Sequence, residues 1–172
     1  IAKACKMSNI KMLYISTDYV FGGEGEDAFE TDSPKAPCNF FFFFKLGGEV
    51  AVTENCEKYF VVRISWVFGE NGKNFVKTML RLSKERDTLN VVCDQIGSPT
   101  YTKDLSNLLC NMIETDNYGI YHATNEGYCS WAEFASKIME LSGAETKIIP
   151  IPGSEYKSAA VRPSNSRLSK KS

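Results

Sequence analysis

Residues 11–21 read Lys-Met-Leu-Tyr-Ile-Ser-Thr-Asp-Tyr-Val-Phe. The apolar residues at the start of this stretch predict a buried strand, and residues 16–19, which follow, carry hydroxyl and carboxyl groups. Enzymes built on parallel sheets place their chemistry where strands end. The stretch therefore predicts a parallel sheet with a polar site at the carboxyl end of one strand.

The rest of the chain alternates between the two kinds of pattern. Strand-like segments occupy residues 59–63, 89–93, 119–122 and 146–151, and helical patterns occupy residues 1–6, 46–56, 74–84, 105–113 and 130–141. Residues 24–39 have loop composition. Ser130 and Glu133 form a capping box before a helix whose expected apolar face is Trp131, Phe134, Ala135, Ile138 and Leu141. This alternation predicts an α/β fold with a Rossmann-type parallel sheet.

Composition limits the classes of function. The chain has 172 residues, of which 43% are hydrophobic, so it can build a core and is not disordered. Its net charge of -1 gives no reason to expect nucleic acid or an anionic membrane as a partner. No apolar run approaches the roughly 20 residues of a membrane span, and no signal peptide pattern is present. We therefore expect a cytoplasmic protein.

The cysteines and glycines carry little functional signal. None of the six cysteines forms a Cys-x-x-Cys pair or lies near His122, the only histidine, so we expect reduced, mostly buried thiols and no metal site. The run Gly22-Gly23-x-Gly25 does not lead into a helix, which favours a plain turn over a phosphate cradle. Gly47 and Gly48 lie within a helical segment, where close packing of the backbone explains them.

Several longer motifs resemble one family. They are Ser16-Thr-Asp-Tyr-Val-Phe21, Lys45-Leu-x-Gly-Glu49, Arg63-x-Ser-Trp-Val-Phe-Gly69, Gly72-x-Asn-Phe75, Asp94-Gln-x-Gly-Ser-Pro-Thr-Tyr-Thr102 with Asp104-Leu105, Gly119-Ile-Tyr-His122 and Arg162-Pro163-x-Asn165-Ser166-x-Leu168. From about Ile1 to Leu168 the chain resembles the dTDP-4-dehydrorhamnose reductases, which are extended short-chain dehydrogenases.

The resemblance implies NADPH or NADH as cofactor and a nucleotide-sugar substrate. The implied reaction reduces the 4-keto group of dTDP-4-dehydro-6-deoxy-L-mannose in dTDP-L-rhamnose biosynthesis. It also implies that the N-terminal half of the family fold, with its glycine-rich turn, is absent from this sequence. Residues 1–69 would then be the C-terminal part of the Rossmann-type domain, and residues 70–172 mainly a substrate-binding region. The resemblance is compatible with a homodimer. Family members can pair through a bound metal, but we assign no metal ligand in this sequence.

The catalytic residues follow from the same resemblance. The family uses a serine or threonine, a tyrosine and a lysine, the last two spaced Tyr-x-x-x-Lys on one helix face. Thr17 matches the hydroxyl that holds the carbonyl oxygen, and Lys45 matches the lysine that lowers the pKa of the tyrosine and binds the nicotinamide ribose. The tyrosine position is Phe41, which has no acidic proton.

The departure at Phe41 leaves two explanations open. Residues 40–44 are all phenylalanine, which fits a sequencing or gene-prediction error within otherwise intact motifs, or a genuine homologue that has lost its activity. Loss of a general acid typically costs about 10²–10⁴-fold in rate, so we expect a poor enzyme in either case. The alternative class is a regulatory or binding protein, similar to the regulatory beta subunit of methionine adenosyltransferase.

The resemblance also assigns binding residues. Those for the cofactor are Ser16, Lys45 and Ser65, and those for the substrate are Asp18, Tyr19, Asn39, Trp66, Asn74 and Arg162. Simpler alternatives stay open for several of them. Asp18 and Tyr19 could make buried hydrogen bonds at the strand end, Trp66 could belong to the core, and Arg162 could form a surface salt bridge. His122 is expected to be a core histidine rather than a catalytic base.

Overall fold

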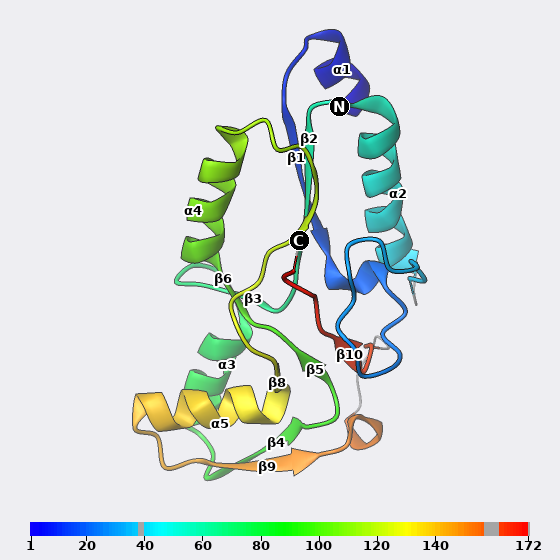
Figure 1. Cartoon of the computed structure of the whole chain (residues 1–172). Coiled ribbons are helices and arrows are strands. Elements are labelled where there is room, and N and C mark those ends of the chain that lie inside the picture. The colour runs from blue at the N-terminus through cyan, green and yellow to red at the C-terminus, as the bar shows by residue number, and fades with distance from the viewer. Residues whose placement is uncertain (38–39, 157–161, 172) are drawn as a thin grey trace.

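The computed structural model describes residues 1–37, 40–156 and 162–171, except the side chains of residues 40 and 41. A parallel sheet runs through one half of the molecule, with the strand order β1 (Met12–Thr17), β2 (Tyr59–Ile64) and β7 (Gly119–His122). Helix α2 (Phe40–Asn55) and helix α4 (Thr102–Ile113) cover its two faces (Figure 1). We call these five elements the sheet layer. The predicted Rossmann-type parallel sheet is confirmed.

The two faces of β2 carry different chemistry because its side chains alternate in direction. Phe60 and Val62 point to the α4 side, where they pack with Leu105 and other apolar residues of that helix. Arg63, which is completely buried, points to the α2 side and meets Glu49. One face of the sheet is thus an ordinary apolar core, and the other encloses an ion pair.

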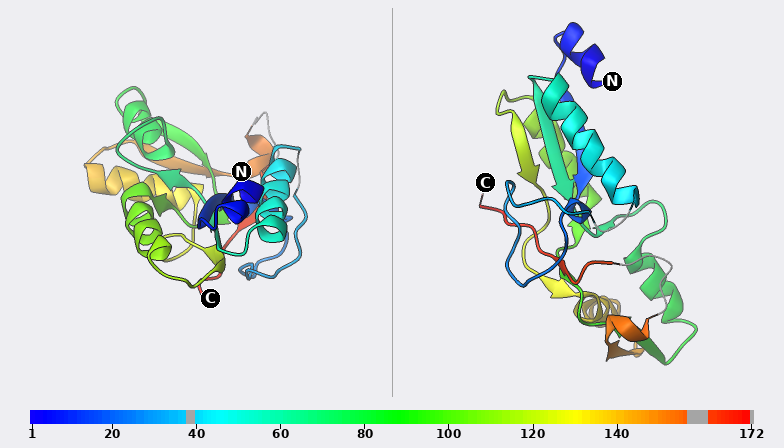
Figure 2. Two further views of the ribbon diagram at one scale, coloured as in Figure 1. Left: turned by 90° about the horizontal axis from the view of Figure 1, so that it is seen from above. Right: turned by 90° about the vertical axis from the view of Figure 1, so that its right-hand side faces the viewer.

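A second group of elements, the pocket layer, lies below the sheet layer (Figures 1 and 2). It contains α3 (Phe75–Leu82), α5 (Trp131–Ser142) and the parallel strands β4 (Thr88–Val92) and β9 (Lys147–Ile151). Its apolar core includes Met79, Leu89, Val91, Ala135 and Ile138. The predicted capping box of α5 is confirmed, but the prediction that Leu141 joins the buried face is wrong, because that side chain is 76% exposed and Met139 is buried instead.

Several short elements complete the fold. Helix α1 (Ala2–Met7) confirms the helical pattern predicted over residues 1–6. The short elements that the pattern did not predict are the two 3-10 turns η1 (Asp18–Val20) and η2 (Gly153–Glu155), and the two-residue strands β3 (Val67–Phe68), β5 (Ile96–Gly97), β6 (Thr100–Tyr101), β8 (Cys129–Ser130) and β10 (Asn165–Ser166). A strand of two residues is too short to show a period of two. Because α4 and β7 belong to the sheet layer, a boundary at residues 69 and 70 does not separate the layers. The assignment of residues 70–172 mainly to substrate binding stays a prediction.

Two glycines allow close approaches that a side chain would prevent. A Cβ atom at Gly48 would lie 2.1 Å from the Tyr14 hydroxyl oxygen, so α2 can pack tightly on β1 only with glycine there. Gly23 has a φ of 78°, and a Cβ atom there would lie 1.9 Å from the Cβ atom of Pro163. The contact at Gly48 confirms close backbone packing for one of the two glycines in α2. The positive φ of Gly23 agrees with the predicted turn.

The cysteines differ from expectation in one respect. The five that are described are free thiols, as predicted, but only Cys56 is buried, and Cys93 and Cys110 are exposed. The prediction of mostly buried thiols is therefore wrong. Among the described residues, no helix is long and apolar enough to cross a membrane.

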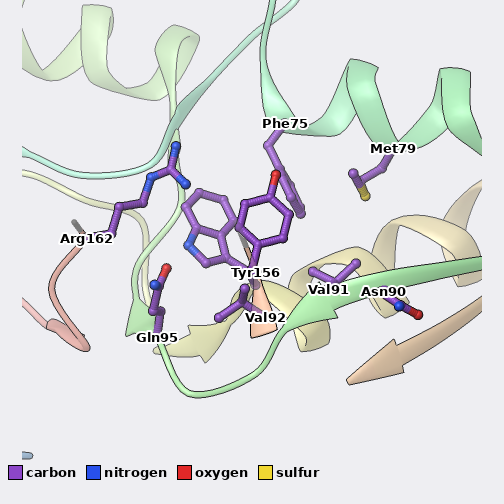
Figure 3. Close-up of a pocket in the computed structure, with 9 residues that line it drawn as sticks. Phe75, Met79, Asn90, Val91, Val92, Gln95, Tyr156 and Arg162 are labelled. Atoms are coloured by element: carbon purple, nitrogen blue, oxygen red, sulfur yellow. The ribbon is translucent and has the colours of Figure 1, made fainter. Parts of the chain in front are cut away.

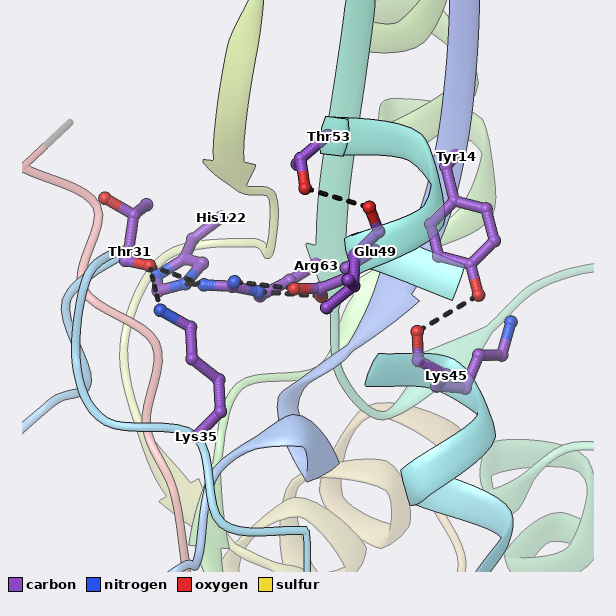
Figure 4. A network of polar contacts seen from close by, with 9 residues as sticks. Tyr14, Thr31, Lys35, Lys45, Glu49, Thr53, Arg63 and His122 are labelled. Carbon is purple, nitrogen blue, oxygen red and sulfur yellow. Dashed lines mark hydrogen bonds and ion pairs between the residues drawn. The ribbon is translucent and has the colours of Figure 1, made fainter. Parts of the chain in front are cut away.

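A buried polar network holds α2 against the sheet (Figure 4). Arg63 donates from Nε and Nη2 to the two carboxylate oxygens of Glu49, at 2.9 and 2.7 Å, and both side chains are almost completely buried. Its Nη1 donates to the carbonyl oxygen of Thr31 at 2.8 Å and lies 3.3 Å from Nε2 of His122. The guanidinium also lies 5.0 Å from the ring centre of Phe21. One arginine therefore connects β2 to a helix, a loop and the neighbouring strand.

Breaking this pair should be costly. We expect Glu49→Gln to lower the free energy of unfolding by about 3–5 kcal/mol, because it leaves a buried guanidinium without its counter-charge. Urea unfolding followed by tryptophan fluorescence measures the change. The matched control is Glu57→Gln, which removes the exposed ion pair with Lys6 and should leave the unfolding midpoint nearly unchanged. Equal effects of the two substitutions would contradict a structural role specific to the buried pair.

Candidate functional site

The carboxyl end of β1 presents the polar residues that the sequence singled out. The Thr17 hydroxyl donates to Asp18 Oδ1 at 2.8 Å and accepts a hydrogen bond from the backbone N–H of Tyr19 at 3.3 Å. Thr17 therefore caps η1, which turns the chain away from the sheet directly after the strand. Ser16 is buried, and its hydroxyl has no partner among the described residues.

Helix α2 brings Lys45 to the same strand end. Its ammonium nitrogen lies 3.3 Å from the carbonyl oxygen of Ile15 and 5.4 Å from the ring centre of Tyr14. The Tyr14 hydroxyl in turn donates to the Lys45 carbonyl oxygen at 3.2 Å, so helix and strand hold each other at this point (Figure 4). The Lys45 ammonium thus contacts β1 at Ile15, two residues before Thr17.

Asp18 is a buried carboxyl group rather than an exposed one. Burial raises its pKa to about 6, and the hydroxyl groups of Ser166 and Thr17 offset this only partly. Asp18 thus makes the buried hydrogen bond that was the simpler alternative to substrate binding, but only through Oδ1. Its Oδ2 atom accepts no hydrogen bond from the described residues.

His122 is a core histidine, as expected. Its Nδ1 lies 3.0 Å from the carbonyl oxygen of Ser169, which makes Nδ1 the protonated nitrogen and leaves Nε2 to accept from Arg63. Burial and the charge of Arg63 lower the pKa of His122 to about 4. The ring is therefore neutral at physiological pH and is fully used by the network around Arg63.

Aromatic rings join the two layers at Trp66. The rings of Trp66 and Trp131 stack at 3.6 Å between centres with an angle of 11°, and Phe75 lies 4.6 Å from Trp131. Trp66 has a φ of 47°, a left-handed conformation that is strained for a bulky residue. A Cβ atom at Gly97 would lie 2.7 Å from the indole, so glycine is needed beneath the ring. The surrounding structure thus holds Trp66 in one strained position.

A pocket of about 340 Å³ opens beside this stack (Figure 3). Its walls combine aromatic rings, aliphatic side chains, two amides and one guanidinium, and its lining residues are Phe75, Met79, Asn90, Val91, Val92, Gln95, Trp131, Tyr156 and Arg162. Arg162 and Gln95 lie at one end and Met79 and Asn90 at the other (Figure 3). Such a lining suits a planar polar ring bound together with an anionic group.

The structure places the predicted residues in two groups. Ser16, Thr17, Asp18, Tyr19 and Lys45 meet at the end of β1, where the Tyr19 ring lies 4.3 Å from that of Phe42. Trp66 and Arg162 belong to the region of the pocket. Asn39 and the side chain of Phe41 lie outside the described residues.

Two predicted residues already have structural partners. The Ser65 hydroxyl donates to the carbonyl oxygen of Ser98 at 2.6 Å and is buried. Asn74 caps α3 by accepting from the Lys77 N–H at 3.0 Å, and its amide donates to the Gly69 carbonyl oxygen at 2.7 Å. Their assignment to ligand binding stays a prediction.

Sequence reasoning did not identify most of the pocket wall. Trp131 was assigned only to the apolar face of a helix, and Tyr156 was not assigned at all. Gln95 stands in a quoted motif without a role. The motif was a usable signal for Gln95, whereas only the tertiary structure brings Tyr156 to the pocket.

Comparisons with known proteins show which family the chain resembles. A family profile described as RmlD substrate binding domain matches residues 1–172. The spore coat polysaccharide biosynthesis protein SpsK of Bacillus subtilis is 45% identical over 157 residues, covering 91% of this chain and 55% of that protein. The dTDP-4-dehydrorhamnose reductase of Salmonella typhimurium is 37% identical over 179 residues, covering 98% of this chain and 60% of that protein.

Solved structures give the same result. The crystal structure of dTDP-4-dehydrorhamnose reductase from Bacillus anthracis in complex with NADP matches with a TM-score of 0.95 and 44% identity, over 99% of this chain and 60% of that one. The orthologue from Clostridium acetobutylicum matches with a TM-score of 0.94 and 39% identity, over 98% and 60%. The chain thus spans 55–60% of the length of these four relatives.

The two buried titratable groups should change stability in opposite directions with pH. The pKa of Asp18 is raised from 3.8 to about 6 in the folded protein, so the folded state binds more protons and gains stability as pH falls through this range. The pKa of His122 is lowered from 6.5 to about 4, so the unfolded state binds more protons and stability is lost as pH falls.

Single substitutions separate these two effects. We compare how the free energy of unfolding changes when the pH falls from 6 to 4. This change should be less favourable by about 2 kcal/mol in Asp18→Asn than in the unaltered chain, and more favourable by a similar amount in His122→Gln. Urea unfolding at several pH values measures both. If the two substitutions shift the pH dependence in the same direction, the assigned protonation states are wrong.

Proposed function

The chain belongs to the RmlD substrate binding domain family, and from this premise we propose that it forms the substrate-binding and lysine-bearing part of a dTDP-4-dehydrorhamnose reductase. The observation that carries the proposal is the position of Lys45, whose ammonium lies 3.3 Å from the Ile15 carbonyl oxygen at the strand end that bears Thr17. Ketone reduction by this type of site needs these two side chains together.

The proposed roles follow from the side chains at the strand end. A reduced nicotinamide cofactor supplies a hydride to the ketone carbon when bound. Lys45 would bind its ribose, and the unpartnered hydroxyl of Ser16 fits the same hydroxyl-rich group. Thr17 would hold the carbonyl oxygen that becomes the alkoxide. NADPH and NADH both suit this arrangement.

The pocket supports a nucleotide sugar as the substrate. We propose that the thymine base lies among the rings of Phe75, Trp131 and Tyr156, where Asn90 and Gln95 offer amide groups. Arg162 at the same rim would contact the diphosphate, which a guanidinium can bind through two hydrogen bonds. Trp66, stacked on Trp131, would then face the sugar between the pocket and the end of β1.

The proton donor is the weak point of the proposed reaction. Position 41 would donate the proton to the alkoxide, and phenylalanine cannot do so. We therefore propose that the protein with this sequence is an impaired reductase. Cytoplasmic location and a homodimer also remain proposals.

Restoring the tyrosine tests this function. The chain is fused to the part of the Bacillus anthracis reductase that its match leaves out, which supplies the rest of that enzyme's length. Phe41→Tyr should raise the rate of NADPH oxidation with the 4-keto sugar nucleotide by at least about 10²-fold, the low end of general-acid contributions. Absorbance at 340 nm follows the reaction.

Two further variants complete this test. Phe41→Tyr combined with Lys45→Met should stay inactive, because the ribose contact is lost. Small residues at 42 and 44 added to Phe41→Tyr should raise the rate further, since Phe42 packs against Tyr19 and can misplace the new hydroxyl. A folded Phe41→Tyr fusion protein that binds NADPH but stays inactive would contradict the proposed reductase site.

A further inference from the structure

The loop after β4 and the turn after β9 are joined by one charged contact. Both carboxylate oxygens of Asp94 lie 2.9 Å from the backbone nitrogen of Gly153, which donates its N–H to them. The two strands already pair in parallel up to Val92 and Ile151, and Cys93 N–H donates to the Ile151 carbonyl oxygen at 2.9 Å. The Asp94 contact continues this pairing beyond the ends of the strands.

Gly153 fits this contact for a steric reason. A Cβ atom there would lie 3.1 Å from Asp94 Oδ1 and 3.4 Å from Nε2 of Gln95. The backbone of the turn is therefore packed directly against two neighbouring side chains, and one of them, Gln95, lines the pocket. A larger residue at 153 would press on both.

The turn leads directly to another pocket wall. Residues Gly153–Glu155 form η2, closed by hydrogen bonds from Glu155 N–H to the Pro152 carbonyl oxygen and from Tyr156 N–H to the Gly153 carbonyl oxygen, at 3.0 and 3.1 Å. Tyr156, which follows, lines the pocket although its side chain is 50% exposed. Figure 3 shows Gln95 and Tyr156 on neighbouring sides of the same space.

We propose that Asp94 is a positioning residue that holds η2 against the loop after β4 and so fixes Gln95 and Tyr156 at the rim of the nucleotide pocket. This rests on the proposed function of the pocket. An exposed carboxylate that accepts a backbone N–H with both oxygens gains more than a neutral acceptor would, because the hydrogen bonds are charge-assisted. The pairing of β4 and β9 holds the strands themselves without Asp94, so its effect is confined to the rim.

Binding of dTDP to the 172-residue chain tests this inference. Tryptophan fluorescence reports binding, because Trp131 lines the pocket and Trp66 stacks on it. Asp94→Ala should weaken dTDP binding about tenfold, the effect of losing a hydrogen bond to a charged group. Asp94→Asn, which keeps an acceptor oxygen but not the charge, should restore part of the affinity. The control is Asp87→Ala, which removes the same charge beside the opposite end of β4 and should leave binding unchanged.

A second measurement needs no ligand. In Asp94→Ala the amides of Glu155 and Tyr156 should exchange their hydrogens at least about tenfold faster, because the contact that holds η2 is lost. Faster exchange with no change in dTDP affinity would overturn the role in binding. Unchanged exchange would overturn the role of Asp94 in holding η2. If the unaltered chain does not bind dTDP, the proposed pocket function fails, and the inference about binding falls with it even where the exchange result supports that role.

Discussion

The buried guanidinium of Arg63 is the constraint on which the sheet layer depends. A charge without exposure must find partners in the protein, and here these are Glu49 on α2, the Thr31 carbonyl oxygen and His122 on β7. Each partner belongs to a different segment, so the arginine determines how all of them meet β2. Gly48 also helps to hold α2 against the sheet, because it lets the helix approach Tyr14 closely.

Fixing α2 in this way has a functional consequence. Lys45 lies one helical turn before Glu49, on the same face, and therefore reaches the end of β1 where Thr17 ends the strand. The pocket layer contributes a pocket next to the stacked Trp66 and Trp131, which is where the proposed function places the nucleotide. In the proposed function, chemistry and recognition would be supplied by different layers, and the stacked rings of Trp66 and Trp131 lie between them.

The sequence was sufficient for the regular elements, because buried strands and amphipathic helices leave clear patterns over five or more residues. The capping box at Ser130 and the turn at Gly23 are further examples of local chemistry that is readable in advance. Burial of Arg63 was not predicted, since arginine is normally exposed and only its tertiary partners explain it. Burial of Asp18 was foreseen only as an alternative, because a carboxyl group at a strand end is compatible with both a buried and an exposed position. The predicted burial of Leu141 and of most cysteines was wrong because an apolar side chain is not always buried.

The central claim is that α2 delivers Lys45 to the carboxyl end of β1. Nuclear magnetic resonance of the labelled chain tests it directly. We expect nuclear Overhauser contacts from the Lys45 side chain to Tyr14 and Ile15, together with an upfield shift of its ε-methylene protons caused by the Tyr14 ring. A folded amide spectrum in which Lys45 shows the shifts of an exposed lysine and no contacts to β1 would contradict the claim.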